Sequence, residues 1–154
     1  MATATSPTSP MTAHQFDDRR IQWRELAGFT HMMVSIFFVD EQRNRVDLLI
    51  KFDPNEKVLL HRHLADTNTF VVEGDHVIYE PDGGVREVRP VGQYTFGTGR
   101  DAHDEGGGPN GCVLYYSVRG ETDALFEMFD ANLQVTATLR TSDFKAVFDA
   151  QQQA

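Results

Sequence analysis

Ten short segments rich in Val, Ile, Phe, Tyr and Thr follow one another along the chain, with turn residues between them. They are residues 32–39, 45–52, 57–63, 68–74, 76–80, 85–90, 93–97, 112–118, 124–130 and 134–139. β-Branched and aromatic side chains favour the pleated, half-buried surface of a strand. A parallel sheet would need helical crossovers of a dozen residues between strands, and the chain has none at these places. The pattern therefore predicts an all-β protein, built as an antiparallel sandwich or barrel.

One segment has convincing helical periodicity, and it lies at the C-terminal end. Phe144, Val147 and Phe148 recur at helical spacing over about residues 143–152, with Ser142 or Asp143 as the expected N-cap. The Ser-, Thr- and Pro-rich residues 1–20 are expected to form a flexible tail, and 21–154 a single domain. The glycine-rich stretch 105–111 is expected to be a mobile hairpin loop, with a substrate lid as the alternative.

Composition and charge narrow the classes of partner. Lys and Arg total 14 and Asp and Glu total 23, so the formal net charge is -9. An acidic surface repels phosphate backbones and anionic lipid heads, so neither nucleic acid nor a membrane is expected as a partner. The N-terminus lacks the basic and apolar regions of a secretory signal, and a cytoplasmic location is expected. Cys112 lies in an apolar run and is expected to be a buried, inert thiol.

The stretch "HRHLADTNTFVVEG", residues 61–74, begins with two histidines two residues apart. On a strand such residues share a face, so His61 and His63 point the same way and Arg62 points the opposite way. A third histidine, His103, follows a strand and a glycine-rich bend. Three imidazoles from adjacent strand ends could close one face of a metal coordination sphere. The remaining histidines, His14, His31 and His76, have no spaced partner and are expected to be structural or solvent-facing.

The first histidine segment resembles the first motif of the cupin family. That motif has a His-x-His pair, then a Glu after three or four residues, then a Gly after six more. His61, His63 and Gly74 match it, and Thr67 stands at the Glu position. The resemblance implies a small β-barrel or jelly roll of the RmlC-like type, with its metal-binding core over about residues 45–120.

A second stretch resembles the second cupin motif more loosely. Gly92 and His103 fall at the right separation. Thr98, Arg100 and Gly107 stand where that motif has Pro, Gly and Asn. Together the two motifs imply one divalent metal held by His61, His63 and His103.

The absence of the motif glutamate makes the pattern similar to the three-histidine cupin dioxygenases, which cleave acetylacetone or dihydroxyacetophenones with non-haem Fe(II). The resemblance implies an Fe(II)-dependent dioxygenase that cleaves a C–C bond of a small diketone or hydroxyketone bound as a chelating enolate. Three neutral imidazoles leave a divalent metal at +2, and such a site attracts an anionic bidentate ligand. Facial binding by three ligands also leaves open positions for substrate and dioxygen.

Two other functions remain open. One is an isomerase or lyase acting on a sugar or small acid with Zn, Mn or Ni, and the other is a non-catalytic ligand-binding or sensor cupin. A bulge could also turn Asp66 or Glu105 inward as a further ligand. Thr67, Arg100 and Glu105 are candidates for supporting the ligand imidazoles or reaching the substrate.

Two expectations concern the packing of side chains near the motifs. The aromatic residues are expected to be mostly core: Phe70, Tyr94, Phe96 and Tyr115. Val58 and Leu60 are expected to face outward, and with the family resemblance they predict a homodimer or homotetramer.

Overall fold

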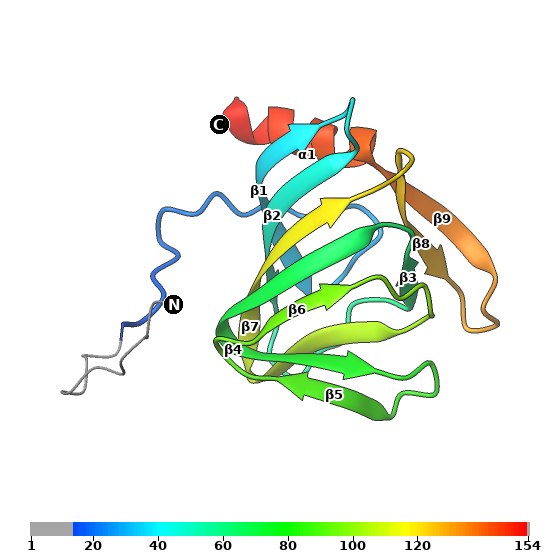
Figure 1. The fold of residues 1–154 in the computed structure, drawn as a ribbon. Coiled ribbons are helices and arrows are strands. Elements are labelled where there is room, and N and C mark those ends of the chain that lie inside the picture. Colours follow the sequence, from blue (N-terminus) through cyan, green and yellow to red (C-terminus); the bar gives the residue numbers. More distant parts are fainter. Residues whose placement is uncertain (1–13, 154) are drawn as a thin grey trace, which may run out of the picture.

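The computed structural model describes residues 14–153, which form nine strands and one helix (Figure 1). In chain order these are β1 (Met32–Asp40), β2 (Arg45–Phe52), β3 (His61–His63), β4 (Asp66–Tyr79), β5 (Val85–Arg89), β6 (Tyr94–Gly97), β7 (Asp104–Arg119), β8 (Ala124–Phe129), β9 (Val135–Arg140) and α1 (Thr141–Gln152). The predicted flexible tail falls largely on residues 1–13, outside the described residues. Within residues 14–20 of the predicted tail, Asp18 accepts hydrogen bonds from Lys51 and from Trp23 Nε1, the latter at 3.2 Å.

The strands form two sheets that enclose one interior (Figure 1). The larger sheet has the order β1-β2-β7-β4-β5, with β6 also paired to β4, and the smaller has the order β3-β8-β9. Every pairing between named strands is antiparallel. The predicted antiparallel barrel with a C-terminal helix is therefore confirmed.

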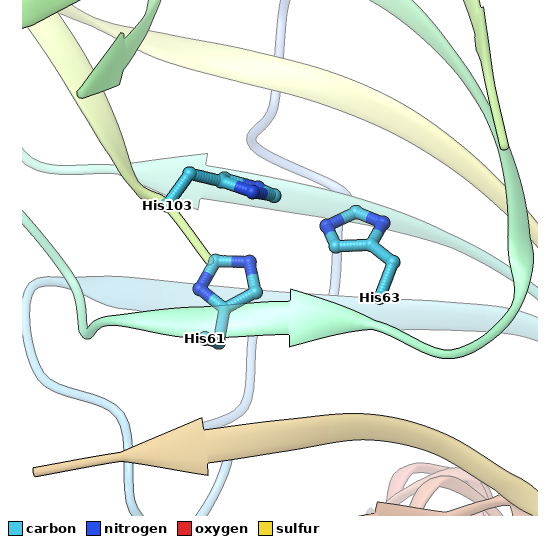
Figure 2. Close-up of side chains that lie close together, drawn as sticks. All are labelled: His61, His63 and His103. Atoms are coloured by element: carbon cyan, nitrogen blue, oxygen red, sulfur yellow. The ribbon is translucent and has the colours of Figure 1, made fainter. Parts of the chain in front are cut away.

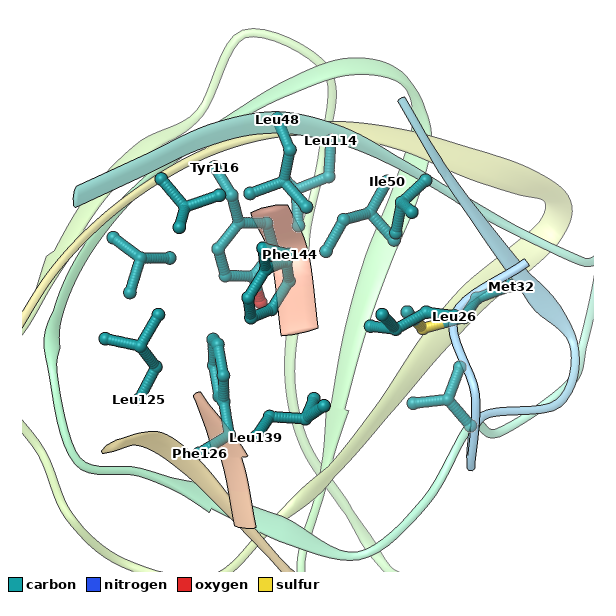
Figure 3. Close-up of a cluster of buried hydrophobic side chains, with 14 of the residues drawn as sticks. Leu26, Met32, Leu48, Ile50, Leu114, Tyr116, Leu125, Phe126, Leu139 and Phe144 are labelled. Carbon is teal, nitrogen blue, oxygen red and sulfur yellow. The ribbon is translucent and has the colours of Figure 1, made fainter. Parts of the chain in front are cut away.

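Alternation along β2 and β7 builds the core (Figure 3). Leu48 pairs with Tyr116 and Ile50 with Leu114, and all four side chains point inward and are buried. The smaller sheet contributes Leu125, Phe126, Met128 and Leu139 from the other side. Cys112 belongs to this core, and burial raises the pKa of its thiol to about 12. It is the buried, unreactive thiol that its apolar neighbours predict.

The glycine-rich stretch is neither a mobile hairpin loop nor a lid, so both expectations were wrong. Residues 105–111 belong to β7, which runs alongside β4. A Cβ at Gly106 would lie 1.9 Å from the carbonyl oxygen of Glu56, and one at Gly107 would lie 2.7 Å from that of Asp53. The glycines therefore allow a neighbouring backbone to approach the strand closely.

The helix begins two residues earlier than expected. Arg140, rather than Ser142 or Asp143, is the N-cap. Its backbone N–H donates to the carboxylate of Asp143 at 2.7 Å, so this acid stabilises the helix start from inside the first turn. Gln151 fixes the other end, because its side-chain amide exchanges two hydrogen bonds with the backbone of Ile36 in β1, at 2.8 and 3.1 Å. None of the helices in the described residues is long and apolar enough to cross a membrane.

The structure corrects both packing expectations. Phe70, Tyr94 and Phe96 are 41, 62 and 57% exposed, because they alternate with residues that face the barrel interior. Val58 is 6% exposed and packs in the core, so it does not face outward, and Leu60 is half-buried. Residues 58–60 lie in no strand, so alternation does not apply there. The homodimer or homotetramer stays a prediction.

Candidate metal centre

His61, His63 and His103 meet inside the barrel (Figure 2). β3 carries His61 and His63 on its inward face, where both are buried. His103 lies just before β7, and its backbone exchanges two hydrogen bonds of 2.9 Å with that of His61. One ring nitrogen from each of the three side chains lies within 4.8 Å of the other two.

Hydrogen bonds fix the orientation of all three rings. Nδ1 of His61 donates to the carbonyl oxygen of Leu59 at 2.7 Å, and Nδ1 of His103 donates to that of Asp101 at 3.1 Å. A carbonyl oxygen only accepts, so in the neutral ring the lone pair is on Nε2. Nε2 of His63 is buried and has no hydrogen-bond partner among the described residues.

A hydrogen bond to Thr67 likewise holds the ring of His63 through Nδ1 and leaves Nε2 with the lone pair. The Thr67 hydroxyl donates to the carbonyl oxygen of Ala65 at 3.3 Å and can accept from Nδ1–H of His63 at 2.9 Å. The residue at the motif's glutamate position therefore holds one of the imidazoles. Hydrogen bonds to the second ring nitrogen are characteristic of metal-binding histidines. The donor set fits a divalent metal, since each ring is held through Nδ1 and one nitrogen of each ring lies within 4.8 Å of the other two.

Burial keeps two of the imidazoles neutral. It lowers the pKa of His63 well below its ordinary value, and the neighbouring His61 adds to the effect. Burial also lowers the pKa of His103. For His61 burial acts in the same direction, but Glu105 outweighs it and the pKa is raised. Only the neutral ring binds a metal, so His63 and His103 are ready to do so at neutral pH.

Glu105 places a buried carboxylate beside the three histidines. Its Oε1 lies 3.4 Å from Nε2 of His61, and its Oε2 accepts from Nε2 of His76 at 2.6 Å and from the hydroxyl of Tyr116 at 2.8 Å. Burial alone would raise the pKa of Glu105, but the adjacent imidazoles of His61 and His76 hold it well below its usual range. The carboxylate reduces the +2 charge expected of a metal bound by histidines alone.

The other two candidates near the motifs lie elsewhere. Asp66 forms an ion pair of 3.0 Å with Arg100, and both side chains are more than two-fifths exposed. Arg100 also donates to the carbonyl oxygen of Ala65 at 3.2 Å. It does not line the cavity beside the histidines. The role of Arg100 towards a substrate stays a prediction.

A cavity of about 140 Å³ opens beside His63 and His103. Polar side chains that sequence reasoning missed line its wall: Thr69 and His76 of β4, Arg89 of β5, Thr95 of β6 and Tyr116 of β7. Thr69 shares strand parity with Thr67, and this signal could have found it. His76 lies beyond two bulges in β4 that break the alternation, and Arg89 lies there only because β5 pairs with β4.

No family model matches the sequence, and no curated protein matches it. Several solved structures are similar to it. An RmlC-like cupin from Ralstonia eutropha has a TM-score of 0.73 at 16% identity, with 93% of this chain and 88% of that chain covered. An acetylacetone dioxygenase from Acinetobacter johnsonii has a TM-score of 0.68 at 12% identity, with coverage of 98 and 99%.

A third structure, a polyketide cyclase from Streptomyces resistomycificus, has a TM-score of 0.54 at 15% identity, with coverage of 84 and 85%. Identities this low show a shared fold. The chain therefore has the fold of the RmlC-like cupins, the fold that its two histidine motifs predict.

Proposed function

We propose that the protein holds one divalent metal on the Nε2 atoms of His61, His63 and His103, and that this metal is Fe(II). The observation that carries the proposal is the convergence of the three rings, each fixed through Nδ1. Imidazole suits iron as well as zinc and nickel, so the ligands do not select iron by themselves. The threonine at the motif's glutamate position and the likeness to an acetylacetone dioxygenase support iron.

The proposed reaction is cleavage of a C–C bond in a small diketone or hydroxyketone by dioxygen. When bound, the metal would supply Lewis-acid stabilisation of an enolate and open positions for its oxygen atoms. Glu105 Oε1 faces the histidines and can take the proton from the carbon between the two carbonyl groups. His76 and Tyr116 fix the orientation of this carboxylate.

Glu105 also favours a second function. A metal-dependent isomerase or lyase needs a protein base beside its substrate, and the sequence motifs alone offer none. Glu105 lies at the cavity wall and next to a histidine of the proposed metal site. With Zn, Mn or Ni in place of iron, the same geometry would move a proton without consuming oxygen.

Oxygen uptake separates the two functions. The purified protein is stripped of metal and reconstituted anaerobically with Fe(II), Zn, Mn or Ni in separate samples. Small diketones and hydroxyketones are then added, and dissolved oxygen and exchange of the substrate's acidic proton are followed. If the protein is a dioxygenase, we expect oxygen consumption by the Fe(II) sample alone. Proton exchange without oxygen consumption in every sample contradicts it and supports the isomerase or lyase.

A further inference from the structure

Five buried side-chain atoms have no hydrogen-bond partner among the protein groups of residues 14–153, and all five belong to residues that line the cavity beside the histidines. They are His63 Nε2, Thr69 Oγ1, His76 Nδ1, Arg89 Nε and Thr95 Oγ1. The proposed metal accounts for the first. A buried polar atom without a partner destabilises a fold, so native proteins rarely keep several together without a ligand or water to serve them.

The other four side chains form two cross-strand pairs on one wall. Thr69 of β4 is the register partner of Thr95 of β6, and His76 of β4 is the partner of Arg89 of β5. Cross-strand partners carry their side chains next to each other. Thr69 is 5% exposed, His76 is fully buried, and the side chain of Arg89 is 17% exposed. The sheet therefore places both polar pairs on the wall of one cavity.

We propose that this wall binds a carboxylate of the substrate, which makes the substrate a small carboxylated diketone or hydroxyketone. The inference rests on the metal centre of the proposed function, where the two chelating oxygens of the same molecule would bind. Arg89 uses Nη2 to hold Glu87 at 2.8 Å, and this leaves Nε–H, which can only donate, for the cavity. The hydroxyls of Thr69 and Thr95 can donate into the same cavity.

His76 adds an acceptor to these donors. Its Nε2 donates to Glu105 at 2.6 Å, so Nδ1 of the neutral ring carries a lone pair. The ring is held by stacking on Phe52, with centroids 5.7 Å apart. An enol or hydroxyl next to the carboxylate would complete the set. A methyl group in the same place would leave every one of these atoms unpaired, and sites built to hydrogen-bond a substrate reject such analogues.

Size limits the substrate further. A cavity of roughly 150 Å³ in another protein admits benzene, and the cavity here is about 140 Å³. A chelating head and one carboxylate fill that space. The substrate class is a short oxo acid.

Two probes differ in the one group that matters. Acetylacetone and 2,4-dioxopentanoate share the chelating β-diketone, and the second has a carboxylate in place of one terminal methyl. Calorimetry on the zinc-loaded protein, and on the Fe(II) protein without oxygen, measures binding without turnover. We expect 2,4-dioxopentanoate to bind about 10- to 100-fold more tightly, the value of a charged hydrogen-bonded pair.

Substitutions assign this preference to the wall. Arg89→Met should abolish it, and Thr95→Val, which keeps the side-chain shape, should reduce it. Arg43→Met removes an exposed arginine of the β1–β2 turn, and this matched loss of charge should keep the full preference. Circular dichroism checks that each variant is folded.

Three outcomes overturn the inference. The first is equal binding of both probes, which would mean that water molecules satisfy the polar atoms of the wall. The second is binding of neither probe, and the third is a preference that survives both Arg89→Met and Thr95→Val. The proposed function fails separately. Oxygen uptake with no carboxylate preference supports the dioxygenase and contradicts the carboxylate site. A carboxylate preference without oxygen uptake supports the carboxylate site and contradicts the dioxygenase.

Discussion

At the scale of single residues, Thr67 shows how a substituted motif position can stay useful. A glutamate there would contribute a ligand oxygen, whereas the threonine hydroxyl accepts from Nδ1 of His63 and fixes that ring instead. The carboxylate of the site comes from Glu105, two residues after His103. The acid is thus displaced in sequence and lies beside the histidines.

Thr67→Val keeps the shape of the side chain and removes the hydrogen bond to His63. We expect metal affinity to fall roughly 10- to 100-fold, the usual effect of losing a group that orients a ligand. Titration against a competing chelator measures it. Thr136→Val, a change of the same kind on the exposed face of β9, is the control and should leave affinity unchanged. Equal affinity in Thr67→Val and the parent protein would contradict this role.

The metal-free protein should lose stability on acidification from pH 7 towards pH 5. Burial lowers the pKa of His63 and His103, so below about 6.5 the unfolded chain binds protons that the folded chain does not. The raised pKa of His61 opposes this loss, and Glu105 contributes only at lower pH because its pKa is depressed. Urea unfolding with a chelator present measures the slope. His63→Asn should flatten it, and an unchanged slope would refute this origin.

At the scale of secondary-structure elements, strand parity decides what the sequence could predict. Most strand positions follow from alternation and turn residues, and the histidine pair on β3 follows from the same rule. Two features did not follow. Bulges in β4 shift the parity before His76, and the close approach of another backbone turns a glycine-rich stretch into part of β7. Both depend on contacts between segments far apart in the chain.

Gly106→Ala tests the close approach along β7. The added Cβ would lie 1.9 Å from the carbonyl oxygen of Glu56, so backbone must move, and we expect a loss of about 3 kcal/mol in the free energy of unfolding. Gly97→Ala is the control, because its Cβ would meet its nearest neighbour, the carbonyl oxygen of Thr67, at 3.8 Å. Chemical denaturation compares the two. A Gly106→Ala protein as stable as the control would show that β7 has room there.

At the scale of the whole molecule, the barrel joins two sheets with different tasks. The smaller sheet presents His61 and His63 from β3, and the larger sheet faces them with the polar wall of β4, β5 and β6. Motif spacing predicts the histidine pair because His61 and His63 lie close together in the sequence. The wall could not be predicted, since Thr95 and Arg89 reach the cavity only through their pairing with β4.

Metal content is the most direct test of the centre. Elemental analysis of the purified, untagged protein counts iron, zinc, nickel, copper and manganese per chain, before and after reconstitution, beside a His103→Ala variant shown by circular dichroism to be folded. We expect about one iron per chain in the parent protein and loss of that metal in the variant. Another metal at the same occupancy would contradict iron and leave the three-histidine site standing. No bound metal after reconstitution, or equal metal in the variant, would contradict the site itself.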